Sequence, residues 1–538
     1  MDHNFLLTGI QAASFEWHFP EHRKIHDRLG RAISAFVKGI FCGYSVSKSQ
    51  QDQFLAFPEC CQSIAGRAIL EKRITERAVA HVSIHNRIGI QSSTEHTPNN
   101  RLEHDRKPEG IDAVNDIKKT IKKAQQTHQK ISILGSGYSQ GGQTTGKNAL
   151  QIDMRKLSRV INIDKEHQEV TVQAGATWKD LQKALIPSGL STSAMQSYAD
   201  FSIGGSIGVN AHGQDVNWNP VSNALISMRV LLMDGRYLNV SRSENPELFK
   251  ALIGSYGLVG IIVEATLKVV PNTLLMKKVS LINTKNYLDH FKAISSKPSL
   301  ALHSARISVN APFVPSRYSI SVNYYDTGTK STPAHDNKAP KYTDPSGLNL
   351  LKKSSFLRRA RATLECYVFE KEGVMTRNQA MGESVQALQN KVPNTKDILQ
   401  EYFIPAEHLQ TFLEKLKQWK QNNPKMTMLN ATLRKVCADR DSLLPYAPND
   451  CFAVVLFMNI PDTKAFEPTM EAATQKLIDS ALSLGGRYYL PYALYARKDQ
   501  VMKAYPEMSQ LIASKNRWDP NRMLDNSFYQ KYFPTQRT

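Results

Sequence analysis

The 538-residue chain lacks the features that mark several common classes of protein. It has only six cysteines, with no C-x-x-C spacing and no histidine pairing typical of a zinc site: Cys42, Cys60, Cys61, Cys366, Cys437 and Cys451. This pattern argues against a disulfide-rich secreted framework and predicts a reduced, cytoplasmic chain without a metal site. The sequence also lacks a run of roughly 20 apolar residues, which a membrane-spanning helix needs, so no such helix is expected.

Acidic residues are scarce relative to basic ones, with 48 Asp and Glu against 68 Lys and Arg and a formal net charge of +20. The excess is not gathered into a nucleic-acid-reading motif, so no nucleic-acid partner is expected. An ordinary basic enzyme is one interpretation, and attraction to an anionic membrane or a phosphorylated substrate is another. One basic cluster, interleaved with apolar residues, favours a solvated helix face, with a peripheral membrane contact as the alternative: Lys352, Lys353, Arg358, Arg359 and Arg361.

Two glycine-rich segments, residues 135–142 and 201–213, are the most informative feature that is present. Glycine allows close backbone approach, and a concavity of backbone N–H groups binds anionic groups such as phosphates. The first segment is not a Rossmann turn, because its glycines are spaced one residue too widely, and it has no P-loop Gly-Lys-Ser/Thr. A pair of such loops therefore favours a flavin dinucleotide over a nicotinamide, whereas the first loop alone is more typical of a surface turn.

The sequence around these loops alternates between predicted helices and strands. Apolar residues recur at helical spacing over residues 114–124, with lysines on the opposite face, and a short apolar strand follows at 130–134. Hairpins are expected over 160–174 and 225–240, and an apolar strand over 260–270. Thr177 with Asp180 predicts a capping box at the start of a helix.

From about residue 111 to residue 271 the chain resembles the FAD-binding domain of the vanillyl-alcohol oxidase and p-cresol methylhydroxylase (PCMH) superfamily. The motifs that carry the resemblance follow the family's order: LGSGYSQGG at 134–142, VQAGATWKDL at 172–181, SIGGS at 202–206, NAHG at 210–213, MDG at 233–235, NPELF at 245–249 and GLVGIIVEA at 257–265. Segments 484–492 and 515–526 resemble the family's closing segments. Within the superfamily the nearest likeness is to decaprenylphosphoryl-ribose oxidase, and more distantly to sugar-lactone and alditol oxidases.

The resemblance implies an α+β fold, with a two-subdomain PCMH-type FAD-binding domain and a substrate domain formed by an antiparallel sheet with flanking helices. We expect an N-terminal extension of unknown role at residues 1–100, the FAD-binding domain at 101–271 and the substrate (cap) domain at 272–500. A C-terminal segment at 501–538 would return to the FAD-binding domain. The polar segment 325–347, rich in Pro and Gly, predicts a long mobile loop. Residues 28–44 are basic and apolar, which favours a packed helix over an interfacial anchor.

The resemblance also implies which residues bind FAD. Many relatives carry a flavin-linked histidine in the first loop, but Tyr138 occupies that position here and cannot form the bond, so noncovalent FAD is expected. The resemblance implies that His212 contacts the flavin without a covalent bond. The alternative is a buried histidine that only forms hydrogen bonds with backbone groups. The expected cofactor-binding residues are Gly135, Ser136, Gly137, Tyr138, Ser139, Gln140, Ser202, Ile203, Gly204, Gly205, Asn210, His212, Ile262 and Tyr489.

The catalytic candidates lie in the C-terminal half. In the ribose-oxidase relatives a lysine follows a Gly-Gly-Arg strand, whereas this sequence has Tyr492 there, and its next lysine is Lys498. Tyr492 is therefore the candidate for proton transfer, and Lys498 is the alternative candidate. The non-catalytic alternative is that Tyr492 is a strand residue that only packs. Arg434 is the candidate for stabilising an oxyanion or a phosphate. Gln400 and Tyr402 are expected to line the same pocket.

These expectations combine into an FAD-dependent oxidoreductase acting on CH–OH. It would transfer a hydride from an alcohol carbon of a polar or lipid-linked, sugar-like substrate to flavin N5, with oxygen, a quinone or another redox partner as electron acceptor. One alternative is a flavin-dependent double-bond reductase, as in the sterol-reductase branch. The other is a non-catalytic flavin-fold binding protein. The expected location is cytoplasmic, with membrane association as the alternative.

Overall fold

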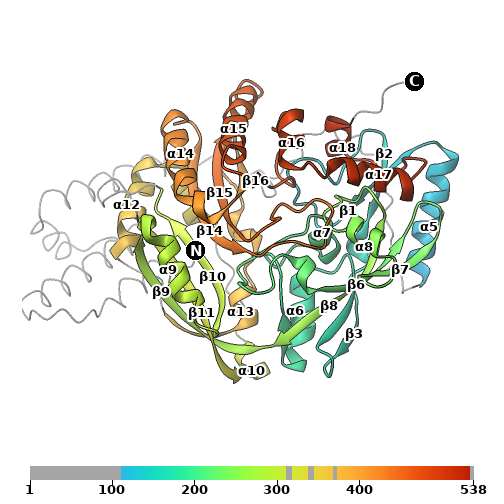
Figure 1. The fold of residues 1–538 in the computed structure, drawn as a ribbon, viewed down its shortest axis with the longest axis horizontal. Helices are drawn as coiled ribbons and strands as arrows, with labels where there is room; N and C mark the ends of the chain where they lie inside the picture. Colours follow the sequence, from blue (N-terminus) through green and yellow to red (C-terminus); the bar gives the residue numbers. More distant parts are fainter. Residues whose placement is uncertain (1–110, 310–317, 337–344, 368–371, 534–538) are drawn as a thin grey trace, which may run out of the picture.

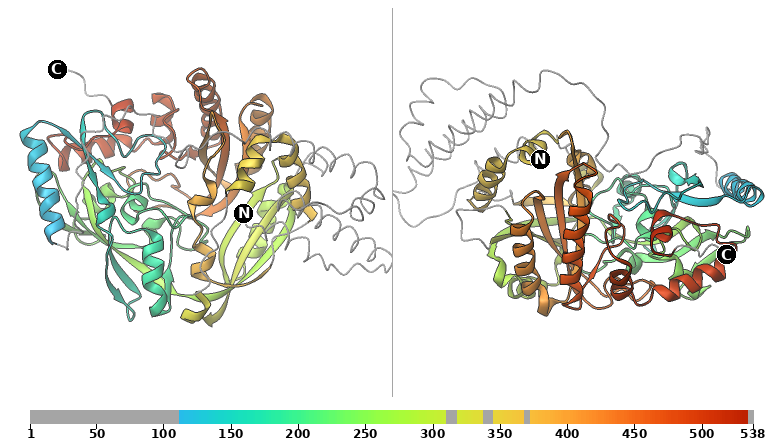
Figure 2. Two further views of the ribbon diagram at one scale, coloured as in Figure 1. Left: turned by 180° about the vertical axis from the view of Figure 1, so that it is seen from behind. Right: turned by 90° about the horizontal axis from the view of Figure 1, so that it is seen from above.

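The computed structural model describes residues 111–309, 318–336, 345–367 and 372–533. Two units lie side by side, a first one over residues 111–271 and a second one over 272–497, and the red closing helices pack back on the first (Figure 1). The further views show the same separation of the blue-green unit from the yellow-orange one (Figure 2). The predicted segment 28–44 lies outside the described residues. In the described part of the chain, no helix is both long and apolar enough to span a bilayer.

The first unit begins with helix α5 (Ile111–Gln126), followed by the parallel strands β1 (Lys130–Leu134) and β2 (Ala149–Asp153). Val114, Ile117, Ile121 and Ala124 are buried in one small core, whereas the lysines on the opposite face of α5 are exposed. The predicted amphipathic helix and the strand that leads into the first glycine loop are therefore confirmed.

A second sheet completes the first unit and is antiparallel throughout, in the order β3-β4-β8-β6-β7, with β5 paired to β8. Both predicted hairpins form, and the capping box is present, with the Asp180 amide donating to Thr177 Oγ1 at 3.1 Å and the Thr177 amide donating to Asp180 at 3.0 Å. The elements are β3 (Val160–Asp164), β4 (Glu169–Gln173), α6 (Trp178–Leu185), β5 (Leu190–Thr192), α7 (Ile203–Gly208), β6 (Leu225–Leu231), β7 (Tyr237–Ser241), α8 (Pro246–Leu252) and β8 (Ile261–Pro271).

The second unit is an antiparallel sheet in the order β12-β9-β11-β10-β14-β15-β13-β16. Its strands are β9 (Thr273–Asn283), β10 (Leu300–Ile307), β11 (Tyr318–Lys330), β12 (Gly373–Thr376), β13 (Thr395–Ile404), β14 (Thr427–Val436), β15 (Cys451–Pro461) and β16 (Arg487–Tyr488). Its helices are α9 (Tyr287–Ser295), α10 (Pro333–Asp336), α11 (Ser346–Lys353), α12 (Ser355–Tyr367), α13 (Arg377–Met381), α14 (Leu409–Asn422) and α15 (Glu467–Leu482). An α+β fold with an antiparallel sheet and flanking helices is thus what the chain adopts.

The closing segment carries α16 (Lys498–Ala504), α17 (Met508–Trp518) and α18 (Ser527–Tyr532). It is attached to the first unit by a parallel bridge between Ile131 and Leu524 and by the buried Lys515, whose Nζ donates to the carbonyl of Leu524 at 2.6 Å and to Asp519 at 2.8 Å. The Ser527 amide donates to the Thr145 carbonyl at 2.7 Å. The closing segment therefore packs against β1 and against the loop that contains the first glycine-rich segment.

Two expectations for the second unit were wrong. Residues 325–330 are not a loop but continue β11, which pairs with β9, and α10 follows at Pro333. Residues 337–344 of the predicted loop lie outside the described residues. The alternation of apolar and polar residues that marks a strand is absent here. The side chains of residues 326–330 are all exposed, so neither face of the strand requires apolar residues. The basic cluster is not simply a solvated face, because the Lys352 Nζ is buried and donates to Asp397 at 2.6 Å.

A buried polar network lies on the face of the second sheet covered by α9. His303 contacts the Tyr287 hydroxyl through Nε2 at 2.9 Å and the side-chain amide oxygen Oδ1 of Asn323 through Nδ1 at 2.7 Å. Because a carbonyl oxygen only accepts, the neutral ring carries its proton on Nδ1 and accepts from the tyrosine on Nε2. Burial lowers the pKa of His303 to about 4, since the charged ring would lose its hydration.

This histidine should make the fold sensitive to acid. The unfolded chain binds a proton at His303 as the pH falls through 6.5, whereas the folded chain does so only near 4, so stability falls across that interval. We expect wild type to lose about 3 kcal/mol more free energy of unfolding between pH 7 and pH 4 than a His303→Gln variant. Urea unfolding at the two pH values measures this difference. His408→Gln, at an exposed histidine, is the control and should keep the wild-type pH dependence; an identical slope in His303→Gln would contradict the assignment.

Candidate functional site

A cavity opens in the first unit between the end of β1, helix α7 and the start of β8. It encloses about 630 Å³ of space, part of it open to solvent. Both predicted glycine segments contribute to its wall, together with apolar side chains above and below. The lining residues are Ile133, Gly135, Ser139, Gln143, Thr144, Met154, Ala174, Gly204, Gly205, Gly208, Val209, Ser255, Tyr256, Gly257, Gly260 and Ile262.

The two glycine segments are in direct contact at this cavity. The Ser136 amide donates to Ser202 Oγ at 3.1 Å, and a Cβ added to Gly135 would lie 2.3 Å from that same oxygen. Gly137 has φ +77°, a left-handed conformation that a side chain would strain. A Cβ on Gly208, by contrast, would meet no atom within 4 Å. Glycine therefore allows the loops to close on each other at Gly135 and keeps space open at Gly208.

A second loop contact ties the cavity to the second unit. The Gln140 amide donates to the carbonyl of Pro491 at 2.9 Å, and its side-chain oxygen accepts from the Leu399 amide at 3.0 Å. Next to it, the ring of Tyr138 packs edge-on against Phe201, with centroids 4.6 Å apart. Burial, and secondly the charge of Asp200, raise the pKa of Tyr138 above its ordinary value.

Glu401 forms a buried polar centre beside the cavity. Its Oε1 lies 2.5 Å from His212 Nε2, and its Oε2 accepts from the hydroxyl of Tyr492 at 3.1 Å. The other ring nitrogen of His212 is buried and has no hydrogen-bond partner among the described residues. Burial first, and then the charge of Glu401, raise the pKa of Tyr492 well above its ordinary value, so the phenol stays protonated and donates.

Tyr489 connects this centre to the cavity. Its amide donates to the Glu401 carbonyl and its hydroxyl to the carbonyl of Val209, both at 3.0 Å, and Val209 lines the cavity. The ring of Tyr489 also packs against Tyr492 at 5.6 Å and against His212 at 6.0 Å. The polar centre and the cavity therefore share one wall.

Arg434 lies on the same face of the second sheet as Glu401. In the strand register Arg434 pairs with Ala453, which pairs with Phe403, two residues along β13 from Glu401. The positive charge of Arg434 acts on both Tyr492 and Tyr198 by lowering their pKa values against the larger effect of burial. Its Nε is buried without a hydrogen-bond partner in the part of the chain that the structure describes. The site thus combines a carboxylate, a histidine, a phenol and a guanidinium.

Comparisons with known proteins give two family matches and several relatives. Residues 111–241 match the FAD binding domain family, and residues 311–532 match the D-arabinono-1,4-lactone oxidase family. The chain is 23% identical to L-gulonolactone oxidase of Mus musculus over 441 residues, which cover 78% of this chain and 93% of that protein. It is 33% identical to D-arabinono-1,4-lactone oxidase of Candida glabrata over 167 residues, 30% of this chain and 31% of that protein. Over 181 residues it is 28% identical to L-galactono-1,4-lactone dehydrogenase of Arabidopsis thaliana, 34% of this chain and 30% of that protein.

The chain belongs to the vanillyl-alcohol oxidase and p-cresol methylhydroxylase superfamily. It is an FAD-dependent oxidoreductase. The cavity fits FAD, because none of its lining residues is Lys, Arg, Asp or Glu and its glycines offer backbone amides for a diphosphate. The apolar side chains of Ile133, Met154 and Ile262 supply surfaces for flat rings, and the open space at Gly208 leaves room for them.

The residues expected to bind FAD in this superfamily member fall into three groups in the structure. Gly135, Ser139, Gly204, Gly205 and Ile262 line the cavity. Ser136, Gly137, Ser202 and Ile203 support its wall, the last as a fully buried core residue. Gln140 and His212 contact the second unit, to which Tyr489 belongs, and Tyr138 packs against Phe201 of the first unit. Asn210 is different, since both ends of its side-chain amide are bound within the protein, to Asp439 and to the Ser222 amide.

Other expectations about the pocket were wrong. Lys498 begins α16 and is exposed, and none of its contacts brings it to Glu401. Gln400 and Tyr402 face away from the site, since Gln400 donates to Thr474 of α15 at 2.6 Å and Tyr402 donates back to Gln400 at 2.8 Å. Because side chains alternate along β13, the residue between them faces the site, and sequence reasoning missed it. The available signal was an acid in the second half of the strand, next to Tyr402, Phe403 and Ile404, because a charged side chain among buried residues needs a partner.

Proposed function

We propose that this enzyme oxidises an alcohol carbon of a sugar lactone, with noncovalently held FAD as the hydride acceptor and oxygen or another redox partner as the final acceptor. The observation that carries the proposal is the Glu401 carboxylate, held between His212 and Tyr492 beside the glycine-lined cavity. When bound, FAD supplies an N5 atom that accepts a hydride. The relatives named as oxidases of gulonolactone and arabinonolactone support a sugar lactone over a lipid-linked sugar.

Glu401 is the proposed proton acceptor. An alcohol carbon that gives up a hydride must also lose its hydroxyl proton, and a carboxylate is a suitable base for it. Tyr492 was the sequence-based candidate for this role, but a phenol whose pKa is raised stays protonated. In the proposal Tyr492 instead donates to Glu401 and fixes the orientation of the carboxylate, while His212 fixes it from the other side.

Arg434 is the proposed substrate-binding cation. Its unpartnered, buried Nε lies on the site-facing side of β14, where a guanidinium can donate to a carbonyl or hydroxyl oxygen of the substrate. A positive charge there also favours negative charge that develops on an oxygen as its proton leaves. The backbone amides of Gly135 and Gly205 would hold the diphosphate of FAD, whereas the Gly204 amide already donates to the carbonyl of Ala174 at 2.7 Å.

Anaerobic addition of L-gulonolactone tests the proposal. Loss of the flavin absorbance near ~450 nm is expected with the lactone alone, because the cofactor itself carries the redox change. Bleaching by NAD(P)H without lactone would instead support the double-bond reductase, and no bleaching by either would support a binding protein. After acid precipitation the yellow colour should remain in the supernatant, whereas colour in the pellet would contradict noncovalent attachment.

Replacing Tyr492 by phenylalanine should have an intermediate effect. The variant loses one hydrogen bond to a charged group, so lactone-driven flavin reduction should slow about 10- to 100-fold in stopped-flow measurements. Tyr495→Phe is the matched control, because its hydroxyl also donates to a carboxylate, that of Glu467, at 2.7 Å, but outside the site. A Tyr492→Phe enzyme as fast as the Tyr495→Phe enzyme would remove Tyr492 from the proposal.

A further inference from the structure

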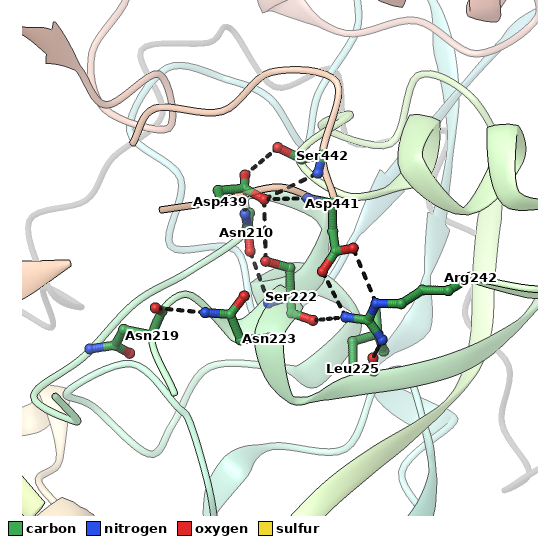
Figure 3. A network of polar contacts seen from close by, with 9 residues as sticks. All are labelled: Asn210, Asn219, Ser222, Asn223, Leu225, Arg242, Asp439, Asp441 and Ser442. Carbon is green, nitrogen blue, oxygen red and sulfur yellow. Dashed lines mark hydrogen bonds and ion pairs between the residues drawn. The ribbon is translucent and has the colours of Figure 1, made fainter. Parts of the chain in front are cut away.

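A network of polar contacts joins the two units (Figure 3). Its hub is Asp439, which follows β14 and is only 4% exposed. The carboxylate accepts from the amides of Asp441 at 3.0 Å and Ser442 at 3.1 Å through Oδ1. Its Oδ2 accepts from the Ser442 hydroxyl and, at 2.8 Å, from the side-chain amide of Asn210 in the first unit. All these donors are neutral groups, and together they satisfy both oxygens of the buried carboxylate.

Asn210 is fixed at three points by this network and its surroundings. Its Nδ2 donates to Asp439, its Oδ1 accepts from the Ser222 amide at 3.1 Å, and its backbone carbonyl accepts from the Tyr446 hydroxyl at 2.7 Å. Its backbone has φ +47°, the left-handed conformation that asparagine and aspartate tolerate better than other side chains. The direction of the chain after Asn210 therefore depends on contacts that hold this conformation.

His212 comes two residues after Asn210, and its ring lies between the same two units. It contacts Glu401 of β13 and packs against Tyr446 at 5.8 Å and Phe403 at 5.5 Å. Tyr446, which also holds Asn210, belongs to the loop that carries Asp439. One loop of the second unit thus sets both the backbone before His212 and part of the wall around its ring.

That loop is itself anchored to the first unit. Arg242 donates to the carboxylate of Asp441 at 2.7 and 3.1 Å. The same guanidinium donates to the backbone carbonyl of Leu225 at 2.6 Å and to that of Ser222 at 2.9 Å (Figure 3). The position of Asp439 is therefore fixed independently of its bond to Asn210.

We propose that Asp439 is a positioning residue of the active site: it holds Asn210 in the left-handed conformation and so aims His212 at Glu401. The inference rests on the proposed function of the Glu401 centre, but the geometry it concerns does not depend on the substrate. The chemistry of the contact offers a direct test, because Asn210 donates and Asp439 accepts across one 2.8 Å hydrogen bond.

The test exchanges the two side chains. Asp439→Asn alone turns an amide NH₂ toward the NH₂ of Asn210, or toward the amides of Asp441 and Ser442 if it flips. Asn210→Asp alone brings two carboxylates together. The double variant Asn210→Asp/Asp439→Asn restores the bond with its direction reversed, keeps an acceptor for the Ser222 amide, and keeps a residue that tolerates the left-handed backbone. Asp450→Asn is the matched control, since it makes the same substitution elsewhere in the loop.

Two readouts separate this proposal from the proposed function. The first is the labelling rate of His212 by diethyl pyrocarbonate, followed by mass spectrometry, which needs no substrate. Both single variants should label several-fold faster than wild type, with His303 labelling unchanged, and the double variant and Asp450→Asn should label at the wild-type rate. The second is lactone-driven flavin reduction, which should slow about 10- to 100-fold in the single variants and recover in the double variant.

The outcomes are distinguishable. Wild-type labelling of His212 in both single variants would overturn the positioning role, and so would a double variant that labels as fast as the single ones. If the single variants do not fold, a double variant that folds and protects His212 supports the proposal, and one that fails to fold overturns it. If the wild-type enzyme reacts with none of the lactones tested, the proposed function is wrong. The labelling of His212 would still decide whether Asp439 is a positioning residue.

Discussion

Replacing Glu401 by glutamine is expected to slow lactone-driven flavin reduction about 10²- to 10⁴-fold, the usual contribution of a positioned acid or base. Glutamine has nearly the same shape as glutamate and keeps one oxygen for the Tyr492 hydroxyl, so the surrounding packing should persist. It cannot accept the proton of the substrate hydroxyl at a working pH. Single-turnover, anaerobic stopped-flow measurement of flavin absorbance gives the rate of this step without product release.

The amount of FAD bound to the Glu401→Gln variant should remain at the wild-type level, because Glu401 is not among the residues that line the cavity. Glu467→Gln is the matched control, since this carboxylate also accepts from a tyrosine hydroxyl but lies on α15, outside the site. A Glu401→Gln variant that reduces its flavin within about threefold of the Glu467→Gln rate would assign the proton to another group, because a lost base costs far more.

The local parts of the fold could be predicted because their causes are local. The spacing of Val114, Ile117 and Ile121 determines which face of α5 is buried, and the capping box at Thr177 depends on a residue three positions away. The glycine loops were recognisable for the same reason. Positive φ at Gly137 and a Cβ clash at Gly135 are requirements of the backbone itself, which leave glycine in the sequence.

The catalytic side could not be predicted in the same way, because it depends on which face of a long strand meets which partner. Along β13 nearly every residue is buried, so the sequence has no polar alternation that would separate the helix-covered face from the site. The predicted pocket residues Gln400 and Tyr402 therefore lie on the opposite face of β13, and the residue between them, Glu401, faces the site. Lys498 is the next lysine after Tyr492 along the chain, but the start of α16 directs it to solvent.

Asn210 shows a further limit of sequence reasoning. Its place in the NAHG motif, next to a glycine-rich loop, favoured a ligand contact, but its side chain is used to bind Asp439, 229 residues later in the chain. No local pattern reports a partner at that separation. The motif contributes to the site through His212, and Asn210 contributes through the backbone conformation that precedes it.

Replacing Gly208 by leucine should weaken the binding of FAD about 10²-fold while the fold remains. Gly208 ends α7 and lines the cavity, and a Cβ there meets no protein atom within 4 Å, so the added side chain would occupy space that the protein does not use. Overfilling a close-packed site costs about 3 kcal/mol, which corresponds to an affinity for FAD about 10²-fold weaker. Titration of the apoprotein with FAD, followed by flavin fluorescence, measures the change.

Gly373→Leu is the matched control, because a Cβ at Gly373 also meets no atom within 4 Å but the residue lies in β12, at the edge of the second sheet. Both variants should keep the circular dichroism spectrum of the wild-type apoprotein, since neither substitution forces a clash within the protein. Only Gly208→Leu should be purified without yellow colour. Wild-type FAD affinity in that variant would mean that the dinucleotide does not occupy the glycine-lined cavity. The proton-accepting role of Glu401 and the orienting role of Tyr492, which depend on a flavin at that wall, would then lose their basis.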